Sequence, residues 1–219
     1  MSSQCPVCGA DTVDFMHQKT KITYHDCHRC GYIHKNPAFY PASAAEKAVY
    51  LQHNNSLAQA DYVAYLRHFL DNALIPHLRA DRRHGLDYGS GPNPVLATLL
   101  ERDYGMKMRL YDPFFHPDSR YADDMYDFIV STEVFEHLRE PMAVFAGLAA
   151  RLRPGGVMAL MTLFHPDDED AFRNWWYIRD ITHIGFFLPR TFALMADTLG
   201  LAVIATDNRR YVTISKKQG

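Results

Sequence analysis

The segment 84–94 constrains the fold of this chain more than any other part of its sequence. It reads as a short strand, the tight turn Gly89-Ser90-Gly91 and the start of a helix. A second short strand, at 108–111, ends in Asp112. Glycine is required where the backbone turns sharply and a ligand comes close. A strand, a glycine turn, a helix and an acid about twenty positions later are how an open parallel sheet holds a nucleoside-bearing ligand.

Two residues beside the glycine turn indicate which ligand fits. The dinucleotide pattern has a third glycine three residues after the second. Pro94 stands there instead, where proline suits the first turn of a helix, so pyrophosphate binding is disfavoured. Asp87, two residues before the first glycine, suits a cofactor with a positively charged, amino-acid-like end, and S-adenosylmethionine is such a cofactor. Taken alone, the turn also fits an ordinary strand-to-helix connection.

The surrounding motifs resemble those of the class I methyltransferases. Leu86-Asp87-Tyr88-Gly89-Ser90-Gly91 is similar to the first motif of that family, with Asn93 in place of the usual third glycine. Residues 126–132 read as a buried strand, and 141–152 read as a helix with one apolar face. The turn Leu152-Arg153-Pro154-Gly155-Gly156 resembles the one before the fifth strand of that family. Residues 201–206 and 211–215 read as a closing hairpin.

The resemblance covers residues 82–217 and implies a fold class. We expect an α/β protein with a Rossmann-like class I methyltransferase sheet, mostly parallel and closed by an antiparallel hairpin. A small N-terminal zinc ribbon is expected to precede this sheet. The region 115–125 is short for the usual third strand of the family.

The same resemblance implies which residues hold S-adenosylmethionine. The methionine end is expected against Asp87 and the backbone of the turn, and Asp112 is expected to accept both ribose hydroxyls. Phe114 is expected either to lie against adenine or to pack in the core. Asp123 or Asp124 is a candidate partner for the adenine amine. The expected cofactor-binding residues are Asp87, Tyr88, Gly89, Ser90, Gly91, Asp112, Pro113, Phe114 and Thr132.

The composition sets wider limits. The 219 residues suit one ordinary domain with a small addition, and 47% hydrophobic and 13% aromatic residues support a packed core. A net charge of −2 provides no general attraction to nucleic acid or to an anionic membrane. No apolar run approaches the eighteen residues of a membrane helix, and the N-terminus does not read as a signal peptide. A cytoplasmic protein without membrane contact is expected.

All four cysteines lie near the N-terminus, as Cys5, Cys8, Cys27 and Cys30. The two pairs, each separated by two residues, have the spacing of a zinc ribbon, and Gly9 and Gly31 follow the pairs as turn residues. Four thiolates complete a tetrahedral site, so this Zn²⁺ is expected to be structural. Two disulfides are the alternative, which a cytosolic chain disfavours. His25 and His28 are expected at the surface.

The chain is expected to divide into two parts. Residues 1–40 form the zinc ribbon and a proline-bounded linker, and 41–219 form the methyltransferase domain with a helical cap over 44–80. The cap reads as two helices. The break between them, 50–56, is either a segment that covers the cofactor or a place where Asn54 and Asn55 cap helices.

The residues that follow the strand at 126–132 carry the expected chemistry. Methyl transfer needs alignment of the acceptor and often the removal of its proton. Glu133, Glu136 and His137 have the spacing of one helical face, which suits either an acid–base set or part of a metal site. This segment resembles the Glu-x-x-Glu-His motif of small-RNA 2′-O-methyltransferases, which bind a divalent ion, and of quinone-biosynthesis O-methyltransferases. If no metal binds here, His137 is expected to act as a base or to form a hydrogen bond with the backbone.

A fourth ligand is available further along the chain. His183 lies in the aromatic segment 175–187, which reads as an acceptor-binding loop, and His165 is a second candidate. The expected catalytic set is therefore His137, Glu133, Glu136 and His183, with Mg²⁺ or Mn²⁺ as the ion.

Three functions remain open at this point. As a whole, the chain resembles bacterial methyltransferase-domain proteins with an N-terminal pair of zinc knuckles. The first function is methylation of an oxygen or nitrogen of a small-molecule acceptor. The second is RNA methylation with the ribbon as a docking arm, although no basic stripe is present. The third is a non-catalytic module that binds a partner protein. The oligomeric state is not indicated.

Overall fold

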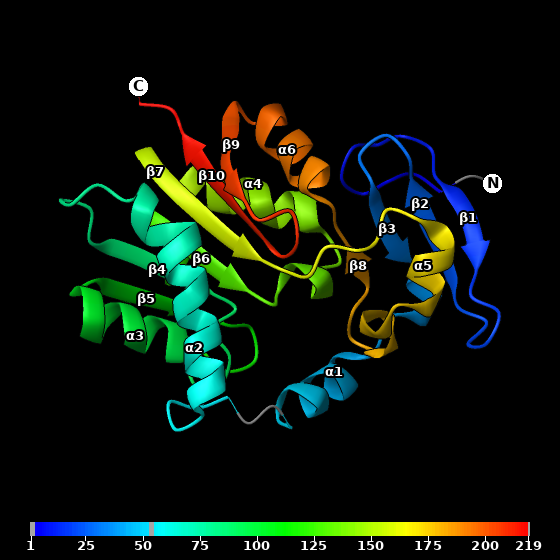
Figure 1. Ribbon diagram of the computed structural model, residues 1–219, viewed down its shortest axis with the longest axis horizontal. Helices are drawn as coiled ribbons and strands as arrows, with labels where there is room; N and C mark the ends of the chain where they lie inside the picture. The colour runs from blue at the N-terminus through cyan, green and yellow to red at the C-terminus, as the bar shows by residue number, and fades with distance from the viewer. Residues whose placement is uncertain (1–2, 53–54, 219) are drawn as a thin grey trace.

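The computed structural model describes residues 3–52 and 55–218, which build two sheets (Figure 1). The larger has the strand order β5-β4-β6-β7-β10-β9. The β4–β5, β4–β6 and β6–β7 pairs are parallel, whereas β10 runs antiparallel to β7 and β9. Its strands are β4 His84–Tyr88, β5 Lys107–Tyr111, β6 Tyr126–Thr132, β7 Leu152–Met161, β9 Leu201–Thr206 and β10 Tyr211–Lys216. The expected mostly parallel sheet with a closing hairpin is confirmed.

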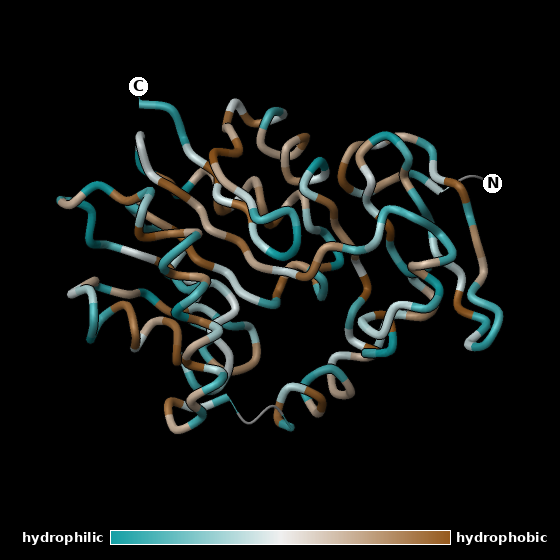
Figure 2. The backbone as a smooth tube through the Cα atoms, viewed as in Figure 1, coloured by the Kyte–Doolittle hydropathy of each residue, from teal (hydrophilic) through white to brown (hydrophobic). Residues whose placement is uncertain are grey.

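Helices cover both faces of this sheet. They are α2 Ala60–Phe69 and α3 Val95–Tyr104 on one face, and α4 Pro141–Arg151 and α6 Pro189–Thr198 on the other. Two further helices lie outside these layers, α1 Ser43–Tyr50 and α5 Glu169–Asn174, and α5 packs against the smaller sheet (Figure 1). Alternate residues of β6 face opposite cores, because Phe128 packs with α2 and α3 while Ile129 packs with α4 and α6. A strand buried on both faces reads as a continuous apolar run, which explains the pattern at 126–132. In Figure 2 the exposed turn between β9 and β10 is hydrophilic.

The β5 edge of the sheet has no further strand among the described residues. Residues 119–123 form the 3-10 helix η4 (Ser119–Asp123) instead, in agreement with the short region expected there. The helical cap also differs in detail from a simple pair of helices. After α2 the chain continues through the π-helix η2 (Leu70–Leu74) and the 3-10 helix η3 (Ile75–His77). Within the break expected between the cap helices, His53 and Asn54 lie outside the described residues.

The smaller sheet joins the N-terminal segment to the C-terminal half of the chain. Its order is β1-β2-β3-β8, with β1 Val13–Met16, β2 Thr23–Cys27, β3 Tyr32–Lys35 and β8 Gly185–Phe186. Cys27 and Cys30 also belong to the apolar core that contains Phe187 and Phe192. A boundary at residue 40 therefore stays a prediction, and the packing crosses it.

Asp127 links the starts of three central strands. Its carboxylate accepts hydrogen bonds from the His84 N–H at 3.0 Å, Arg82 Nη1 at 2.9 Å and Arg153 Nη1 at 3.2 Å. Burial alone would raise the pKa of Asp127, but these donors hold it at about 2. Because the folded-state pKa lies below the unfolded value, the stabilisation is complete above pH 4 and is lost as the pH falls through about 2.

We expect Asp127→Ala to lower the free energy of unfolding by about 2–4 kcal/mol at pH 7, because it leaves buried donors without an acceptor. Urea denaturation at pH 7 and pH 3 measures this loss, and the difference between variant and wild type should shrink at the lower pH. The exposed carboxylate Asp123 provides the control, and Asp123→Ala should stay within about 0.5 kcal/mol of wild type. Equal stability of the two variants would contradict the role given to Asp127.

Candidate active site and cysteine cluster

A cavity of about 470 Å³ opens where β4, β5 and β6 end, at the carboxyl edge of the parallel strands. In open α/β sheets this edge is where ligands bind. Three loops and the α1–α2 region line the cavity. The sequence-predicted residues on its wall are Asp87, Tyr88, Gly89, Ser90, Gly91, Asp112, Pro113, Phe114, Thr132, Glu133, His137 and His183.

The glycine turn has the backbone that its sequence predicts. Gly89 has φ +81° and Gly91 has φ +66°, both in the left-handed region. A Cβ on Gly89 would lie 2.3 Å from Cγ2 of Val134, whereas one on Gly91 would meet nothing within 4 Å. Ser90 Oγ is buried and has no hydrogen-bond partner among the described residues. An open backbone beside an unpaired hydroxyl fits a polar ligand such as the carboxylate end of S-adenosylmethionine.

Two carboxylates flank this turn. Asp87 is 2% exposed, and burial, with a smaller contribution from the Asp112 carboxylate, raises its pKa to about 7. Asp112 Oδ1 accepts from the N–H groups of Phe114 and Phe115, and Oδ2 accepts from that of Gly91 at 3.0 Å. A carboxylate offers about four acceptor positions, so Asp112 keeps about one for a ribose hydroxyl. Asp87 is free to favour a nearby cation.

Of the residues predicted to contact adenine, only Phe114 lies at the cavity. Phe114 lies on the cavity wall, 5.6 Å from the ring of Tyr50, so it is not a core residue. Neither Asp123 nor Asp124 lines this cavity. Asp124 Oδ2 lies 3.6 Å from Nε2 of His84, at the opposite end of β4, so it is not available to the adenine amine.

The Glu-His segment does not form the single helical face that its spacing suggests. Only Phe135–His137 forms a 3-10 helix, η5, and Glu133 precedes it with φ +54°. A left-handed backbone at a residue other than glycine is strained and occurs at functional sites. The Glu133 carboxylate is held by the hydroxyls of Tyr65, at 2.7 Å, and Tyr177, at 2.9 Å.

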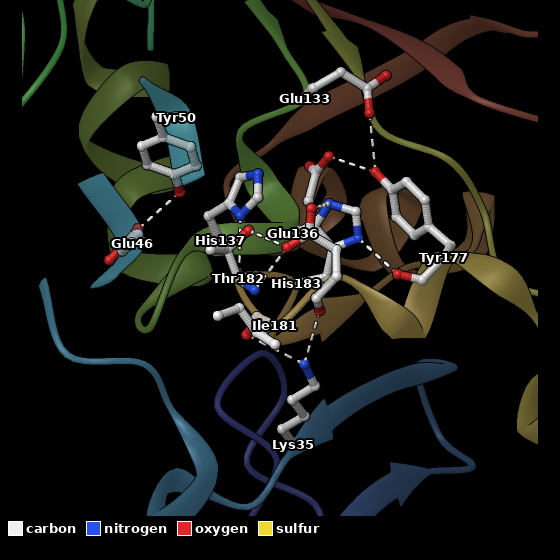
Figure 3. Close-up of polar contacts among 11 residues, drawn as sticks. Lys35, Glu46, Tyr50, Glu133, Glu136, His137, Tyr177, Ile181, Thr182 and His183 are labelled. Carbon is white, nitrogen blue, oxygen red and sulfur yellow. Dashed lines mark hydrogen bonds and ion pairs between the residues drawn. The ribbon is translucent and has the colours of Figure 1, made fainter. Parts of the chain in front are cut away.

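The rings of His137 and His183 lie next to each other, with their centroids 5.0 Å apart, and each directs its Nδ1 to a backbone carbonyl (Figure 3). His137 Nδ1 lies 2.9 Å from the Thr182 carbonyl, and His183 Nδ1 lies 2.8 Å from the Tyr177 carbonyl. A carbonyl can only accept, so each Nδ1 carries the proton and each Nε2 keeps its lone pair. Burial lowers the pKa of His183 to about 4 and also lowers that of His137, so both rings are neutral at pH 7.

Tyr177 connects the two glutamates. Its hydroxyl lies 2.9 Å from Glu133 Oε2 and 2.5 Å from Glu136 Oε1. Since a hydroxyl has a single proton, it donates to one carboxylate, and the second contact is a hydrogen bond only when that carboxyl is protonated. Withdrawal from water, together with the mutual repulsion of the two carboxylates, raises the pKa of Glu133, and burial raises that of Glu136. The pair therefore retains a proton unless a cation lies nearby.

One oxygen, from Glu136, and one nitrogen each from His137 and His183 lie within 4.8 Å of one another. Glu136 Oε2 is buried and has no hydrogen-bond partner among the described residues. Glu133 lies outside this group, so the structure unites three of the four predicted ligands. His165, the second candidate for the fourth position, has its Nε2 2.8 Å from the Gly31 carbonyl and faces the cysteine-bearing segment instead.

Sequence reasoning missed part of this site. Tyr65 lies in the second of the two expected cap helices, for which the sequence predicts no polar role, and Tyr177 is one of several aromatics in the segment 175–187. Both hydroxyls bind Glu133. The one available signal was a tyrosine at positions where an apolar stripe needs no hydroxyl. Asp180 also lines the cavity, and its carboxylate accepts from the N–H and the hydroxyl of Thr182.

The four cysteine sulfurs lie within 4.8 Å of one another. The closest pairs are Cys5 with Cys30, at 3.6 Å, and Cys8 with Cys27, at 3.4 Å. These separations exceed the ~2.05 Å of a disulfide and approach the ~3.8 Å between ligands of tetrahedral zinc. Gly9 and Gly31 have φ +70° and +74°, as the expected knuckles require. The four sulfurs therefore fit a structural Zn²⁺.

One expectation beside this cluster is wrong. His25 is buried at 4% exposure, and its Nδ1 lies 2.6 Å from Asp14 Oδ1. It pairs across β2 and β3 with His34, whose ring lies 4.8 Å away. His28, in contrast, is exposed as expected.

A family model described as a methyltransferase domain matches residues 52–206. The chain belongs to this methyltransferase family. S-adenosylmethionine is the cofactor expected of the family, and Ser90, Gly91 and Asp87 fit it as described above. No curated protein matches the chain.

Solved structures share the fold at low sequence identity. The mitomycin 7-O-methyltransferase MmcR is 13% identical with a TM-score of 0.50, over 63% of this chain and 50% of that one. An O-methyltransferase family protein from Burkholderia thailandensis is 14% identical with a TM-score of 0.52, over 80% and 68%. DesVI from Streptomyces venezuelae is 14% identical with a TM-score of 0.53, over 81% and 100%. The chain thus spans half the length of MmcR. Among the described residues no helix is long and apolar enough to cross a bilayer.

The raised pKa of Asp87, about 7, predicts a pH dependence of cofactor affinity. The α-ammonium of S-adenosylmethionine is predicted to lie near Asp87, where it would favour the ionised carboxylate, so binding would be accompanied by loss of a proton from Asp87 at low pH. We expect the affinity to rise about tenfold from pH 5.5 to pH 7, a range in which the ligand's ammonium stays charged. Isothermal titration calorimetry measures this change.

The Asp87→Asn variant should bind S-adenosylmethionine more weakly at pH 7 and without that pH dependence. Asp197→Asn is the matched control, because Asp197 is an exposed residue of α6 outside the cavity. It should retain the wild-type profile. An unchanged pH profile in Asp87→Asn would show that another group governs cofactor binding.

Proposed function

We propose that this chain is an S-adenosylmethionine-dependent methyltransferase that methylates an oxygen or nitrogen of a small-molecule acceptor. The observation that carries the proposal is that the glycine turn and the Glu136–His137–His183 cluster belong to one site. Ser90, Gly91, His137 and His183 all line the same cavity of about 470 Å³. A methyl donor and an acceptor must meet in such a space for in-line transfer.

On the donor side, the chain would hold a positively charged cofactor. S-adenosylmethionine supplies a methyl group on a positively charged sulfur. Asp87 would hold the ammonium, and Asp112 would accept from a ribose hydroxyl. The glycine turn brings backbone close to the methionine end, where Ser90 offers an unused hydroxyl. Phe114 offers an apolar wall for adenine.

On the acceptor side, the chain offers a proton acceptor and an ion-binding group. Glu136, His137 and His183 would hold a divalent ion, which would orient the acceptor oxygen and lower its pKa. Ligating histidines usually donate the other ring N–H to a carbonyl, as both of these do. Two imidazoles and one carboxylate suit Mn²⁺ better than Mg²⁺. Glu133, with its raised pKa and its place on the cavity wall, would take the acceptor proton.

A reaction without an ion uses the same residues differently. The neutral ring of His137 has a lone pair on Nε2 and can itself remove the proton. The unpaired, buried Oε2 of Glu136 favours the ion, because a carboxylate oxygen without a donor or a cation is costly to bury.

The charges around the cavity favour a small, uncharged or cationic acceptor over RNA. Of the described residues that line it, none is Lys or Arg, whereas Glu46, Asp87, Asp112, Glu133 and Asp180 are acids. Proteins that bind nucleic acid neutralise phosphates with Lys and Arg. Two of the structural neighbours carry O-methyltransferase names, which supports an oxygen acceptor. A non-catalytic module would have no need for a tyrosine-held glutamate and two oriented imidazoles on the wall of one cavity.

The cysteine cluster completes the proposal. We assign it a structural Zn²⁺ with four thiolate ligands, Cys5, Cys8, Cys27 and Cys30, and no open position for substrate. The ribbon, residues 1–40, is then a structural element of the enzyme and not a docking arm for RNA.

The central test is transfer of labelled methyl from S-adenosylmethionine into fractionated cell extract. We expect label in the low-mass pool, at least tenfold less after EDTA treatment, and recovery on addition of Mn²⁺ with retained zinc. His183→Ala should lower transfer at least a hundredfold. His68→Ala, an exposed histidine of α2, is the control and should transfer at the wild-type rate. Label in RNA would overturn the small-molecule proposal, and metal indifference would assign His137 as the base.

Substitution of Glu133 and of Glu136 should affect different quantities, the transfer rate and the Mn²⁺ affinity respectively. We expect Glu136→Gln to weaken Mn²⁺ affinity about 10–100-fold, because it removes a ligand charge. Glu133→Gln should leave Mn²⁺ affinity within about threefold and lower the transfer rate most strongly above about pH 8, where the Glu133 carboxyl is ionised and can act as base. Electron paramagnetic resonance of Mn²⁺ and a pH–rate profile measure the two quantities. Equal loss of Mn²⁺ affinity in both variants would place Glu133 among the ligands.

A further inference from the structure

We propose that the N-terminal ribbon supports the loop 177–187 from outside the cavity and that Lys35 is the positioning residue that transmits its rigidity to His137 and His183. This proposal extends the proposed function. Only its predicted effect on methyl transfer rests on that function, whereas its structural part does not. It concerns three connections between β3 and the loop 177–187, which follow in order.

The first connection is strand pairing. β3 pairs with β8 in antiparallel register, Ile33 opposite Phe186 and His34 opposite Gly185. A Cβ on Gly185 would lie 2.3 Å from the hydroxyl oxygen of Tyr32, so the ribbon packs against this position too closely for any side chain. A strand of two residues, such as β8, has little stability of its own. Its conformation therefore depends on β3.

The second connection runs through Ile184, the neighbour of His183. The Lys35 N–H donates to the Ile184 carbonyl at 2.9 Å, and the Ile184 N–H donates to the Glu136 carbonyl at 2.8 Å. One residue thus links the backbone of the ribbon to the backbone of the Glu-His segment. A displacement of β3 would move both ends of the histidine cluster.

The third connection is the Lys35 side chain. Lys35 is 1% exposed, and Nζ donates to the carbonyl of Asp180 at 3.1 Å and to that of Ile181 at 3.3 Å (Figure 3). The next carbonyl along the loop, from Thr182, accepts the His137 Nδ1 proton. A buried ammonium is costly unless its donors are satisfied. Lys35 therefore fixes the peptide groups on which the orientation of His137 depends.

The ribbon is itself anchored on the other side of this loop. Thr191 Oγ1, in α6, donates to the Cys30 carbonyl at 2.9 Å, and His165 Nε2 lies 2.8 Å from the Gly31 carbonyl. The second knuckle of the cysteine cluster thus connects to the segments before and after the loop. Loss of the knuckle would release 177–187 while leaving the cofactor residues on β4 and β5 in place.

The test compares Lys35→Met with Lys19→Met, an exposed lysine of the ribbon. Long-range ¹H–¹⁵N spectra of the imidazoles should show the Nδ1–H tautomer for His137 and His183 in wild type and in Lys19→Met. In Lys35→Met we expect these Nδ1 protons to exchange with solvent at least tenfold faster, with the Kd for S-adenosylmethionine within threefold of wild type. Methyl transfer should fall at least tenfold. Persistence of both protected Nδ1 protons in Lys35→Met would overturn the proposal.

A second measurement tests the proposal even if Lys35→Met fails to fold, because it uses only the wild-type protein. Amide hydrogen exchange is followed in wild-type protein before and after removal of zinc, with zinc content checked directly. We expect peptides from 177–187 to exchange at least tenfold faster together with those from 23–35, and peptides from 84–112 to stay protected. Exchange confined to 5–35, or unfolding of the whole chain, would contradict the proposal. Neither readout needs methyl transfer, so failure of the proposed function would appear separately, as a wild-type protein without activity.

Discussion

The parallel pairing of β4 with both β5 and β6 determines where the glycine turn, Asp112 and the Glu-His segment lie. Asp87 is in register with Leu110 on one side and Val130 on the other, so the three strands end at one level. Both faces of the sheet are covered by helices, which leaves its carboxyl edge as the open place for a ligand. The glycine turn, Asp112 and Glu133 each follow one of these strand ends, and all of them line one cavity. Asp112 also accepts from the Gly91 N–H, 21 positions earlier in the sequence.

This edge collects more negative charge than the fold can stabilise alone. Asp87, Glu133 and Glu136 all have raised pKa values, for which burial is the main cause. A carboxyl with a raised pKa makes folding less favourable as the pH rises through that value, so the free protein is destabilised by its own site. Positive charge brought by the ligands reverses that effect. In the proposed function, the same acids that weaken the free protein would favour a sulfonium donor and a cation at the acceptor side.

The sequence predicts those parts of the structure that depend on neighbours along the chain. The glycine turn, the closing hairpin and the two cysteine knuckles have local signatures, and all three formed as expected. Contacts across the fold have no such signature. The pairing of β3 with the two-residue β8 could not be predicted, because Gly185 and Phe186 do not read as a strand. For the same reason Tyr65 and Lys35 were not recognised: their partners lie 68 and 145 positions away.

The loop 177–187 explains why a small chain would keep a cysteine cluster far from its cofactor. Acceptor-binding loops gain specificity from irregular backbone, but catalysis requires side chains held within a fraction of an ångström. In this chain Tyr177 and His183 lie on the segment 177–187, whose only regular structure is the end of the 3-10 helix Trp176–Arg179 and the two-residue strand β8. The required rigidity comes from outside, through β3, the Lys35 ammonium and the knuckle at Cys30. A metal bound by the four cysteines would then also help to fix the geometry of the proposed active site, although none of these cysteines lines the cavity.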